Sequence, residues 1–364
     1  MKSVEWGEYK LGDLFKIEST NSFNADMLVN GTEYDYVTRT STNQGIMRTT
    51  GFVNSENINP PKTWSLGLLQ MDFFYRTKPW YAGQFVRKII PKIAIPENPA
   101  LYFTSVLNKY KTKLLSVLVR NVDETFNEMS VKLPTKNNKI DFDFMESFIA
   151  ELKAERLANL KAYLQASGLD DYELTDEEKK IVDEYKNHKI CLSEFSFSKV
   201  FNRIEQGRRL KKADQQKGSI PFVMSGITNT GVVGYISNPV AFFPENSITI
   251  DIFGNSFYRK YAFGAGDDTG VYWNDRCDYS TKMMLYFTAA MEKTLKGKFS
   301  YGKKLRSSQS LNFKMQLPTK DGKPDYELME ILISAIQKLV IKDVVLYADN
   351  KIKTTETIIE QNDD

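Results

Sequence analysis

The sequence predicts an α+β protein made of two similar domains, each of which ends in a long helix. An internal repeat is the first reason. The tetrapeptide LYFT occurs at 101–104 and 285–288, and LPTK occurs at 133–136 and 317–320, so each pair lies 184 positions apart in a chain of 364 residues. Short aromatic segments of alternating polarity favour antiparallel strands. One long amphipathic stretch follows each LPTK, and such a stretch favours a helix.

The repeat extends well beyond these tetrapeptides. The tripeptide Phe-Tyr-Arg at 74–76 returns at 257–259, and Tyr-Val with Thr-Asn-x-Gly-Ile at 36–46 returns as Phe-Val with Thr-Asn-x-Gly-Val at 222–232. The offset drifts between 183 and 186, as expected when insertions fall in loops. About 180 residues suffice for a domain with its own core. The chain is therefore one unit used twice.

The same elements are expected in the same order in each unit. Alternating segments at 9–15 and 195–201 open the units, and strands such as 219–223 follow. Turn residues separate the strands, so we expect a twisted, mostly antiparallel sheet. Helices fit 99–118 and 280–296, where apolar residues recur at helical spacing.

Long helices are expected over 141–165, with Asp141 or Asp143 as the cap, and over 326–347. Neither is apolar enough all round to be buried inside one domain. We therefore expect the two helices to pair antiparallel as a spacer and to cover each other's apolar stripes. The residues expected to pack in this seam are Met145, Ile149, Leu152, Leu160, Met329, Ile333, Ile336 and Val340.

These elements divide the chain into five parts. A shorter acidic helix at 176–187, with Thr175 as its cap, is expected in the linker. The expected parts are a first domain, a spacer helix with linker, a second domain, a second spacer helix and a polar tail, at residues 1–140, 141–189, 190–324, 325–348 and 349–364.

Charge is distributed unevenly along the chain. The net charge is only +3, but residues 190–320 carry 19 Lys and Arg against 10 Asp and Glu, whereas 141–187 is acidic. A basic globular part suggests a polyanionic partner. No apolar run is long enough to span a membrane or to form a secretory signal. Cys191 and Cys277 form no metal-binding or disulfide pattern, so we expect no metal site and a cytoplasmic location.

The motifs that could carry catalysis are better explained as structure. Asn-Pro-Pro-Lys at 59–62 resembles the catalytic motif of amino-methyltransferases, but its Lys cannot stack on a flipped base, and no glycine-rich cofactor loop is present. We interpret it as a turn. Asp141 with Glu151 and Lys153 would form a nuclease pattern only on the spacer helix. His188 is the single histidine and is expected at the surface.

The order of elements resembles the specificity (S) subunits of type I restriction–modification systems, and especially the single-chain S subunits of type IIB systems. The matching residues are Tyr-Gly-Lys-Lys-Leu-Arg at 301–306, both LPTK segments, Asp-[Phe/Tyr]-x-x-Met-Glu after each of them, and the segment at 36–46. Each motif is moderately specific by itself. Their order, repeated twice over nearly the whole chain, carries the resemblance.

The resemblance implies that each globular unit is a target-recognition domain for one half of a split DNA site. It implies that the long helices set the distance between the halves and dock the partner subunits. A helix of 25 residues is about 37 Å long, close to the ~34–36 Å of one DNA turn. The implied partners are double-stranded DNA and methyltransferase subunits, with a restriction subunit as a further candidate. The chain itself would need no cofactor, whereas its partners would use S-adenosylmethionine and Mg²⁺.

Candidate DNA contacts fall in polar loops of both units. Basic clusters suit phosphate contacts, whereas Arg, Asn and Gln read base edges. Asn43 and Asn229 could equally well form a turn before Gly45 and Gly231. The candidates are Arg39, Asn43, Gln44, Arg48, Arg120 and Asn121 in the first unit, and Arg208, Arg209, Lys211, Lys212, Ser225, Thr228, Asn229, Lys303, Lys304 and Arg306 in the second.

Other readings stay open on the sequence alone. Arg76 and Arg259, matched across the units and flanked by aromatic residues, either contact DNA or brace the fold, and we favour bracing. The function expected first is a non-catalytic DNA-specificity subunit of a methyltransferase or restriction complex. The alternatives are a self-contained nucleic-acid-modifying enzyme with an unrecognised site and a two-domain protein-interaction scaffold.

Overall fold

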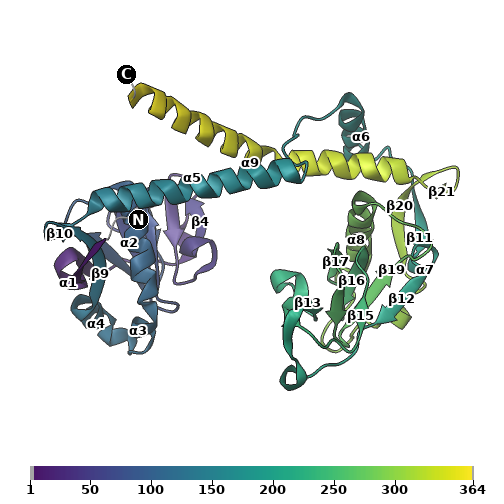
Figure 1. The fold of residues 1–364 in the computed structure, drawn as a ribbon, viewed down its shortest axis with the longest axis horizontal. Helices are drawn as coiled ribbons and strands as arrows, with labels where there is room; N and C mark the ends of the chain where they lie inside the picture. The colour runs from purple at the N-terminus through teal and green to yellow at the C-terminus, as the bar shows by residue number, and fades with distance from the viewer. Residues whose placement is uncertain (1–3, 363–364) are drawn as a thin grey trace. The chain divides into compact units, whose positions relative to one another are not determined.

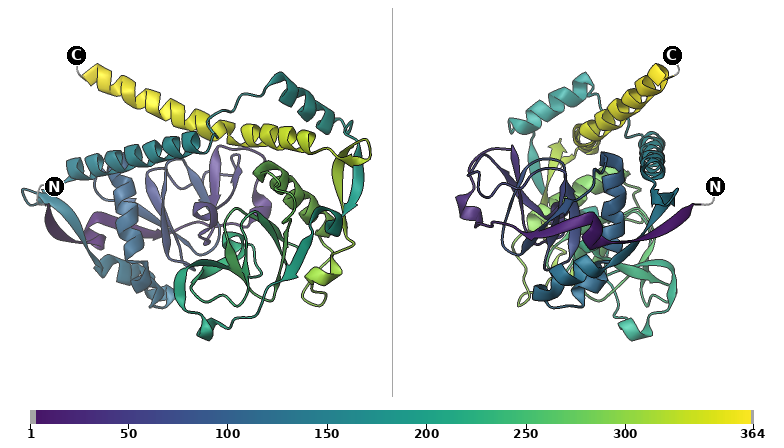
Figure 2. Two further views of the ribbon diagram at one scale, coloured as in Figure 1. Left: turned by 45° about the vertical axis from the view of Figure 1, so that its right-hand side comes forward. Right: turned by 90° about the vertical axis from the view of Figure 1, so that its left-hand side faces the viewer.

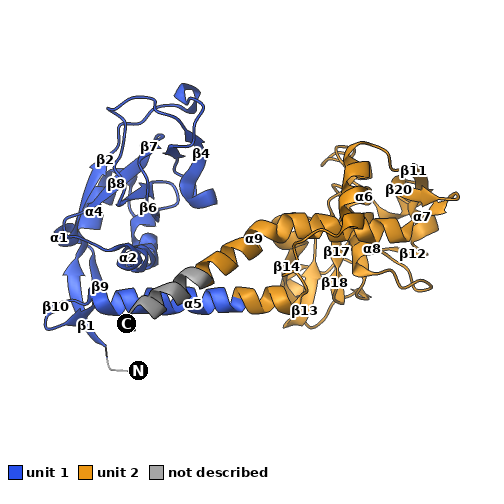
Figure 3. Ribbon diagram, turned by 90° about the horizontal axis from the view of Figure 1, so that it is seen from above, with its two compact units in different colours: residues 1–159 blue, residues 160–364 orange. Residues whose placement is uncertain are grey.

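The computed structural model describes residues 4–362 and divides into two compact units, Met1–Asn159 and Leu160–Asp364 (Figure 3). Each unit mixes sheets and helices, as predicted (Figure 1). The boundary falls within the long helix α5 (Phe142–Ala166), which runs without a break from one unit into the other. Among the described helices, none combines the length and the hydropathy that a bilayer crossing requires.

The first unit holds a four-stranded sheet in the order β2-β8-β5-β6 and two three-stranded sheets, β4-β3-β7 and β1-β9-β10. Every neighbouring pair is antiparallel except β3 with β7, so the mostly antiparallel prediction is confirmed. The strands are β1 (Glu5–Lys10), β2 (Phe15–Ser19), β3 (Tyr34–Val37), β4 (Ile46–Thr50), β5 (Thr63–Gly67), β6 (Asp72–Arg76), β7 (Trp80–Ala82), β8 (Val86–Pro91), β9 (Ser130–Lys136) and β10 (Lys139–Ile140).

Helices and aromatic side chains build the core of the first unit. Phe15 stands edge-on to Trp64, Phe103 and Phe126, which joins β2 and β5 to α2 and α4. The helix predicted over 99–118 is broken into two at Tyr110. The helices are α1 (Leu11–Leu14), α2 (Glu97–Lys109), α3 (Lys111–Leu115) and α4 (Val122–Glu128), with short 3-10 turns η1 (Ala25–Met27), η2 (Thr42–Gly45) and η3 (Val119–Asn121).

The second unit repeats this topology. Its sheets have the orders β12-β19-β16-β17, β14-β13-β18-β15 and β11-β20-β21, and the parallel pair is again the equivalent one, β13 with β18. The strands are β11 (Leu192–Ser196), β12 (Arg203–Gln206), β13 (Lys217–Val223), β14 (Val232–Ile236), β15 (Phe242–Phe243), β16 (Ser247–Asp251), β17 (Ser256–Arg259), β18 (Phe263–Ala265), β19 (Thr269–Trp273), β20 (Lys314–Lys320) and β21 (Lys323–Pro324).

The repeat predicted from the sequence is thus a repeat of fold, with β15 as the one added strand. Both LPTK segments end a strand, β9 or β20, and the predicted polar turns follow them. The helices and 3-10 turns of the second unit are α7 (Phe197–Val200), α8 (Thr281–Leu295), η4 (Lys212–Asp214), η5 (Thr228–Gly231) and η6 (Ser307–Gln309).

The two long helices differ from the prediction in what covers them. Met145 and Met329 are fully buried in the cores of their own units. Val340, expected in a seam between the helices, is 73% exposed, so that placement was wrong. The helix α9 (Tyr326–Asn362) also continues through most of the predicted polar tail; positions 363 and 364 of that tail lie outside the described residues.

The end of α5 and the segment that follows it run antiparallel to α9 inside the second unit. The last turns of α5 lie beside α9, where Lys161 Nζ is 3.8 Å from Asp349 Oδ1. The chain then runs back along α9 until Asp171 Oδ2 meets Lys338 Nζ at 2.7 Å. Sequence numbers rise on one side while they fall on the other, so the two segments run in opposite directions. Leu164 and Ala348, on these two stretches, are both buried.

The linker to the second unit is held down by a short helix. The helix α6 (Asp176–Lys186) packs against α9 (Figure 2). As predicted, Thr175 is its cap: the Thr175 hydroxyl accepts from the Glu178 N–H, and the Glu178 carboxylate accepts from the Thr175 N–H. Glu178 also lies 3.2 Å from Lys338 Nζ. The predicted linker is therefore an ordered part of the second unit.

Candidate nucleic-acid interface

A tight turn at equivalent places in the two units brings the predicted polar residues together. In the first unit it joins β3 to β4, and Asn43 and Gln44 both adopt left-handed backbone angles, with φ of 48° and 55°. In the second it joins β13 to β14, and Asn229 and Thr230 have φ of 47° and 51°. Two consecutive left-handed residues are typical of a tight hairpin turn. The sequence similarity at 36–46 and 222–232 thus reflects one shared loop.

The glycine that follows each turn is required by its geometry. Gly45 and Gly231 have φ of 76° and 83°. A Cβ on Gly231 would lie 2.6 Å from the Met224 carbonyl oxygen, and real side chains do not tolerate such an approach. The Thr38 N–H donates to the Gly45 carbonyl, and the Met224 N–H donates to the Gly231 carbonyl. These bonds close both loops in the same way.

A buried arginine holds the turn of the first unit from below. Arg76, at the end of β6, donates from Nη2 to the Gln44 carbonyl at 2.6 Å and from Nε and Nη2 to Ser65 Oγ at 3.0 and 2.6 Å. Its guanidinium lies 5.7 Å from the Phe74 ring. Burial lowers the pKa of Arg76 to about 10, so the side chain stays charged at neutral pH. Because the group is buried, Arg76 braces the fold, as favoured from the sequence.

Arg259 does the same in the second unit. Its Nη2 donates to the Thr230 carbonyl, its Nη1 donates to Thr230 Oγ1 at 3.0 Å, and its Nε donates to Thr249 Oγ1 at 3.0 Å. The Phe257 ring lies 5.4 Å away. Burial lowers the pKa of Arg259 as well. Thr230 and Gln44 occupy the same position of their turns, so both arginines hold equivalent carbonyls.

The two asparagines are turn residues in the structure. Asn43 Nδ2 donates to the Ile46 carbonyl at 3.1 Å, and Asn229 Nδ2 donates to the Val232 carbonyl at 3.2 Å. Asparagine also tolerates the left-handed conformation better than most residues. Of the two readings open on the sequence, the structure favours the turn. Gln44 and Thr228 are exposed beside them.

Arg39 is the candidate of the first unit best placed to meet a ligand. It lines a surface hollow of about 640 Å³ together with Asn43 and Met47. Its exposed guanidinium lies 5.2 Å from the Phe85 ring, an arrangement that orients a cation. No hydrogen bond or ion pair engages Arg39 within residues 4–362. By contrast, Arg48 Nη2 is already bonded to the Ala25 carbonyl at 2.6 Å.

The corresponding residue of the second unit points inward. Ser225 occupies the place of Arg39, and its hydroxyl donates to Asp251 Oδ2 at 3.2 Å. Asp251 is buried and also accepts from the backbone N–H groups of Gly226, Phe253 and Asn255. Ser225 is therefore part of a loop-fixing network, which favours a structural role, and its part as a base reader stays a prediction. The sequence Asp-x-Phe-x-Asn at 251–255 does not predict this turn by itself, because the burial of Asp251 is seen only in the structure.

A different basic hollow marks the second unit. Arg208, Arg209 and Arg306 line one opening of about 710 Å³ with Val240 and Phe242. Phe242 is 58% exposed and was not singled out by the sequence analysis, because an aromatic residue in a strand is usually buried. Arg306 Nη1 donates to the Asp267 carbonyl. Arg208 and Arg209 have no such partner among the described residues.

The remaining candidates are exposed but scattered. Lys211 and Lys212 continue the basic loop beyond Arg209, and Lys304 Nζ lies 4.6 Å from the ring of the exposed Tyr301. Lys303 lies beside Phe299. Arg120 and Asn121 are exposed in η3, between α3 and α4.

The motifs set aside from the sequence are structural. Asn-Pro-Pro-Lys forms the turn that enters β5, where the Lys62 N–H donates to the Arg76 carbonyl and Thr63 Oγ1 donates to the Pro60 carbonyl. His188 is exposed, as predicted. No group of three or more His, Cys, Asp or Glu residues that could hold a metal ion occurs in the described part of the chain.

Comparison with known proteins points to one family. Residues 3–162 and 193–346, one segment in each unit, match the family model of the type I restriction modification DNA specificity domain. The type II restriction enzyme BgcI specificity subunit S.BcgI from Heyndrickxia coagulans is 25% identical over 347 residues, which cover 93% of this chain and 96% of that protein. The similarity therefore spans both units and the helices that follow them.

The fold also matches a solved structure. The S subunit of a type I restriction-modification system from M. genitalium has a TM-score of 0.56 with this chain at 14% sequence identity. The match covers 99% of this chain and 96% of that one. Two tandem α+β units with long helices are thus an architecture already seen in a natural protein.

Proposed function

The chain belongs to the family of type I restriction modification DNA specificity domains, and we propose that each of its two units reads one half of a two-part DNA site. It is a DNA-specificity subunit of a restriction–modification system, and it directs the complex to DNA. Two units of one topology are what a two-part site requires. The first unit would meet its half with the arginine-held turn and the hollow lined by Arg39, and the second with its own turn and the basic hollow of Arg208, Arg209 and Arg306.

The paired arginine-held turns are the observation that carries this proposal. The turns have the same backbone and the same buried brace in both units, so the scaffold is shared. The exposed residues around them differ, since Arg39 in one unit is replaced by the inward-facing Ser225 in the other. A shared scaffold with different exposed side chains suits two readers of different half sites.

We propose that the chain is not itself catalytic and works with methyltransferase subunits that bind S-adenosylmethionine. A restriction subunit that uses Mg²⁺ would be a further partner. The purified chain, incubated with DNA, S-adenosylmethionine and Mg²⁺, should neither transfer methyl groups nor cut. Methyl incorporation by the chain alone would contradict the proposal.

The basic loop of the second unit provides the direct test of DNA binding. Replacing Arg208, Arg209, Lys211 and Lys212 by Ala should weaken binding to every duplex, because these exposed cations suit phosphate contacts. Each lost phosphate contact should lower the slope of log K against log salt by about 0.9. The measurement is the affinity of the assembled complex for DNA over a salt series.

A matched control separates local contacts from net charge. Replacing Lys179, Lys180, Lys186 and Lys189 by Ala removes the same four charges from exposed positions on or beside α6. This variant should leave the salt slope close to that of the wild type. An equal loss of DNA affinity in the two variants would mean that the effect comes from overall charge. The basic hollow would then have no specific role in DNA binding.

A further inference from the structure

Phe85 adopts a backbone conformation that its side chain disfavours. It lies in the turn between β7 and β8 with φ of 61°, in the left-handed region that Gly and Asn enter readily and bulky residues rarely do. Phe85 is 54% exposed, so burial of its ring does not account for the conformation. Strained residues of this kind concentrate at functional sites. Phe85 is therefore a candidate functional residue, although no motif of the sequence marks it.

The repeated turn does not itself require a left-handed residue. In the first unit the Leu68 N–H donates to the Phe85 carbonyl at 2.9 Å. In the second unit the Ile252 N–H donates to the Asp268 carbonyl at 3.1 Å, so Asp268 occupies the equivalent place between β18 and β19. Asp268 nevertheless does not have a positive φ. The backbone bond is kept in both units, whereas the strain is present in the first alone.

The Phe85 ring lies against the guanidinium of Arg39. The Arg39 Cζ atom is 5.2 Å from the ring centroid, and no hydrogen bond or ion pair engages Arg39 within residues 4–362. A long Arg side chain has many rotamers, and fixing it before binding reduces the entropy that binding costs. An aromatic face orients a guanidinium and leaves its N–H groups free to donate. The ring is therefore suited to preorganise Arg39.

The second unit holds the equivalent position with two carboxylates. Ser225 occupies the place of Arg39. Its N–H donates to Asp268 Oδ2 at 3.0 Å, and its hydroxyl donates to Asp251 Oδ2 at 3.2 Å. Asp251 is the last residue of β16. Both carboxylates thus fix the loop, and neither needs a charged residue at the place of Ser225.

The first unit has no carboxylate at either of these places. Phe85 stands at one of them, and Gly67, the last residue of β5, stands at the other. A Cβ on Gly67 would lie 2.9 Å from the Arg39 Cα, so the backbone of Arg39 occupies the space that a side chain would need. A carboxylate there would pair with the guanidinium and compete with a nucleic acid for it. The first unit thus orients Arg39 with a ring and leaves its charge unpaired.

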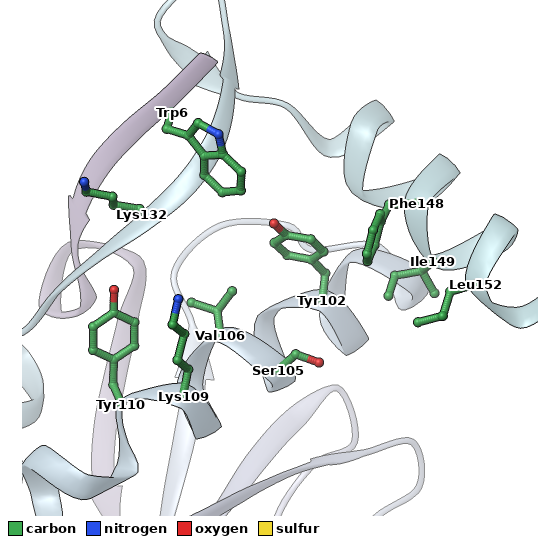
Figure 4. Close-up of a pocket in the computed structure, with 10 residues that line it drawn as sticks. All are labelled: Trp6, Tyr102, Ser105, Val106, Lys109, Tyr110, Lys132, Phe148, Ile149 and Leu152. Carbon is green, nitrogen blue, oxygen red and sulfur yellow. The ribbon is translucent and has the colours of Figure 1, made fainter. Parts of the chain in front are cut away.

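The hollow that Arg39 lines is suited to a base edge, whereas another hollow of the first unit is not. The other hollow, of about 570 Å³, has Tyr102 and Phe148 among its lining residues (Figure 4), which include no Arg, Asn or Gln. The hollow beside Arg39 is also lined by the exposed Gln84. Arg, Asn and Gln are the side chains that bond two atoms of a purine edge. Base reading therefore belongs at the Arg39 hollow.

We propose that Phe85 is a positioning residue for base reading by the first unit. Its ring holds the Arg39 guanidinium in place to donate two hydrogen bonds to a guanine edge. This inference rests on the proposed function, which supplies the DNA. The strain at Phe85 is kept because the left-handed backbone sets the ring beside Arg39. The second unit has Ser225 and Asp268 at these two places and reads its half site with other groups.

Phe85→Gly separates positioning from a role in stability. Gly adopts a φ of 61° without strain, and this relief offsets the loss of a half-exposed ring, so the melting temperature of the chain should not fall. The preference for guanine at the base pair that Arg39 reads should fall about two- to fivefold, since an exposed cation–π contact contributes ~0.5–1 kcal/mol. The assembled complex is measured against libraries in which either half site is randomised. A lower melting temperature with unchanged preference would show that Phe85 is structural and would overturn the inference.

A double substitution tests whether Phe85 acts through Arg39. In the Arg39→Ala background, Phe85→Gly should cause no further loss of base preference, because the group that the ring holds is gone. Losses that add would mean that the ring contacts DNA by itself, and the inference would be wrong. Phe85→Tyr keeps a ring beside Arg39 and should retain the preference of the wild type.

Asp268→Gly is the matched control from the second unit. Asp268 has no positive φ and accepts from the Ser225 N–H, so this change should lower the melting temperature and leave the half site of the first unit read as before. An equal loss of that preference in Asp268→Gly and Phe85→Gly would overturn the inference. A wild-type complex without any base preference would defeat the proposed function itself. A preference that Arg39→Ala removes and Phe85→Gly leaves intact would defeat the positioning inference alone.

Discussion

At the scale of single residues, the two buried arginines are the most informative feature of the chain. Neither Arg76 nor Arg259 has a carboxylate within ion-pair distance among the described residues. Burying a cation without a counter-ion is costly, and it is tolerated only when hydrogen bonds satisfy the donors. Here carbonyl and hydroxyl oxygens of the arginine-held turns do so. The cost indicates that the position of the turn matters to the protein.

Removing one of these arginines should destabilise its unit. Arg259→Ala is expected to lower the free energy of unfolding by about 2–4 kcal/mol, because it opens a space and leaves the oxygens of Thr230 and Thr249 without their donors. Lys260→Ala, a neighbouring exposed site, should change it by less than about 0.5 kcal/mol. Urea denaturation of the three proteins measures the difference. Similar stabilities for both variants would show that the brace is dispensable.

A substitution at Asn229 tests whether its amide reads a base or shapes the turn. With φ at 47°, Gly should keep the turn and Ala should strain it by about 1 kcal/mol. If the side chain only shapes the turn, Asn229→Gly retains the base preference of the complex. A loss of about 1–3 kcal/mol at one base pair in the Gly variant would instead show that the amide reads that base. Binding to a library of two-part sites supplies the measurement.

These residues show what the sequence could and could not provide. Asn followed by x-Gly predicts a turn, and the repeat predicts that both units share it. The matched Phe-Tyr-Arg tripeptides suggested bracing, but the bonded carbonyl could be found only in three dimensions. Ser225 looked like a reader because it is a polar residue next to a matched strand end, but its hydroxyl donates to Asp251, 26 positions later. Contacts over such distances are invisible to local patterns.

At the scale of elements, the linker is tied to α9 by one lysine. Lys338 Nζ meets Asp171 Oδ2 at 2.7 Å and Glu178 Oε2 at 3.2 Å, and it donates to the Glu173 carbonyl at 2.8 Å. The hydrogen bond from Lys338 and the N–H of Glu173 lower the pKa of Asp171. Burial raises the pKa of Glu178. The hydrogen bonds from Thr175, Ser334 and Lys338 together lower it by more than burial raises it, so the net shift is downward.

The stability that Lys338 provides should depend on pH in a defined direction. A carboxyl group whose pKa is lowered by folding stabilises the protein above its ordinary pKa, and that stabilisation is lost as the pH falls through the folded value. The ordinary values are 3.8 for Asp171 and 4.5 for Glu178. Lys338→Met should therefore lower the melting temperature at pH 7, and the gap from the wild type should close as the pH falls below these values.

Lys342→Met is the control for this pH series. Lys342 lies one turn further along α9 and forms no ion pair within the described residues. Its variant should follow the wild type at every pH. A gap between wild type and Lys338→Met that stays constant down to acidic pH would show that packing of the lysine stem, rather than charge, holds the linker.

The long helices show why a sequence predicts that a helix forms more reliably than it predicts which elements pack against that helix. Both helices were predicted almost to the residue at their start, from their apolar periodicity. Asp141, one of the two caps expected for the first helix, accepts from the N–H three residues later, and Asp325 does the same for the second helix. The elements that pack against these helices were not predicted, because an apolar stripe shows only that one face of a helix is buried and not which element buries it. In the structure, Met145 and Met329 are buried in their own units.

At the scale of the whole molecule, duplication separates scaffold from specificity. The strand order, the parallel pair and the braced turn all recur. Elements that do not recur include β15 and α6 of the second unit and α3 and α4 of the first, and the exposed side chains around each turn also differ. A common scaffold lets each unit change its contacts without changing its fold. Such independence is what the proposed reading of two different half sites requires.

This independence gives the last prediction. Arg39→Ala should cost about 1–3 kcal/mol at one base pair, because a free arginine beside a turn can bond a guanine edge with two donors. The effect should be confined to one half of the two-part site, since Arg39 belongs to the first unit alone. Ser225→Ala, at the equivalent position, should leave base preference unchanged, because the Ser225 hydroxyl already serves Asp251. The assembled complex is measured against libraries in which either half site is randomised. Arg39→Ala changing the preference in both halves equally would mean that the units do not read DNA separately.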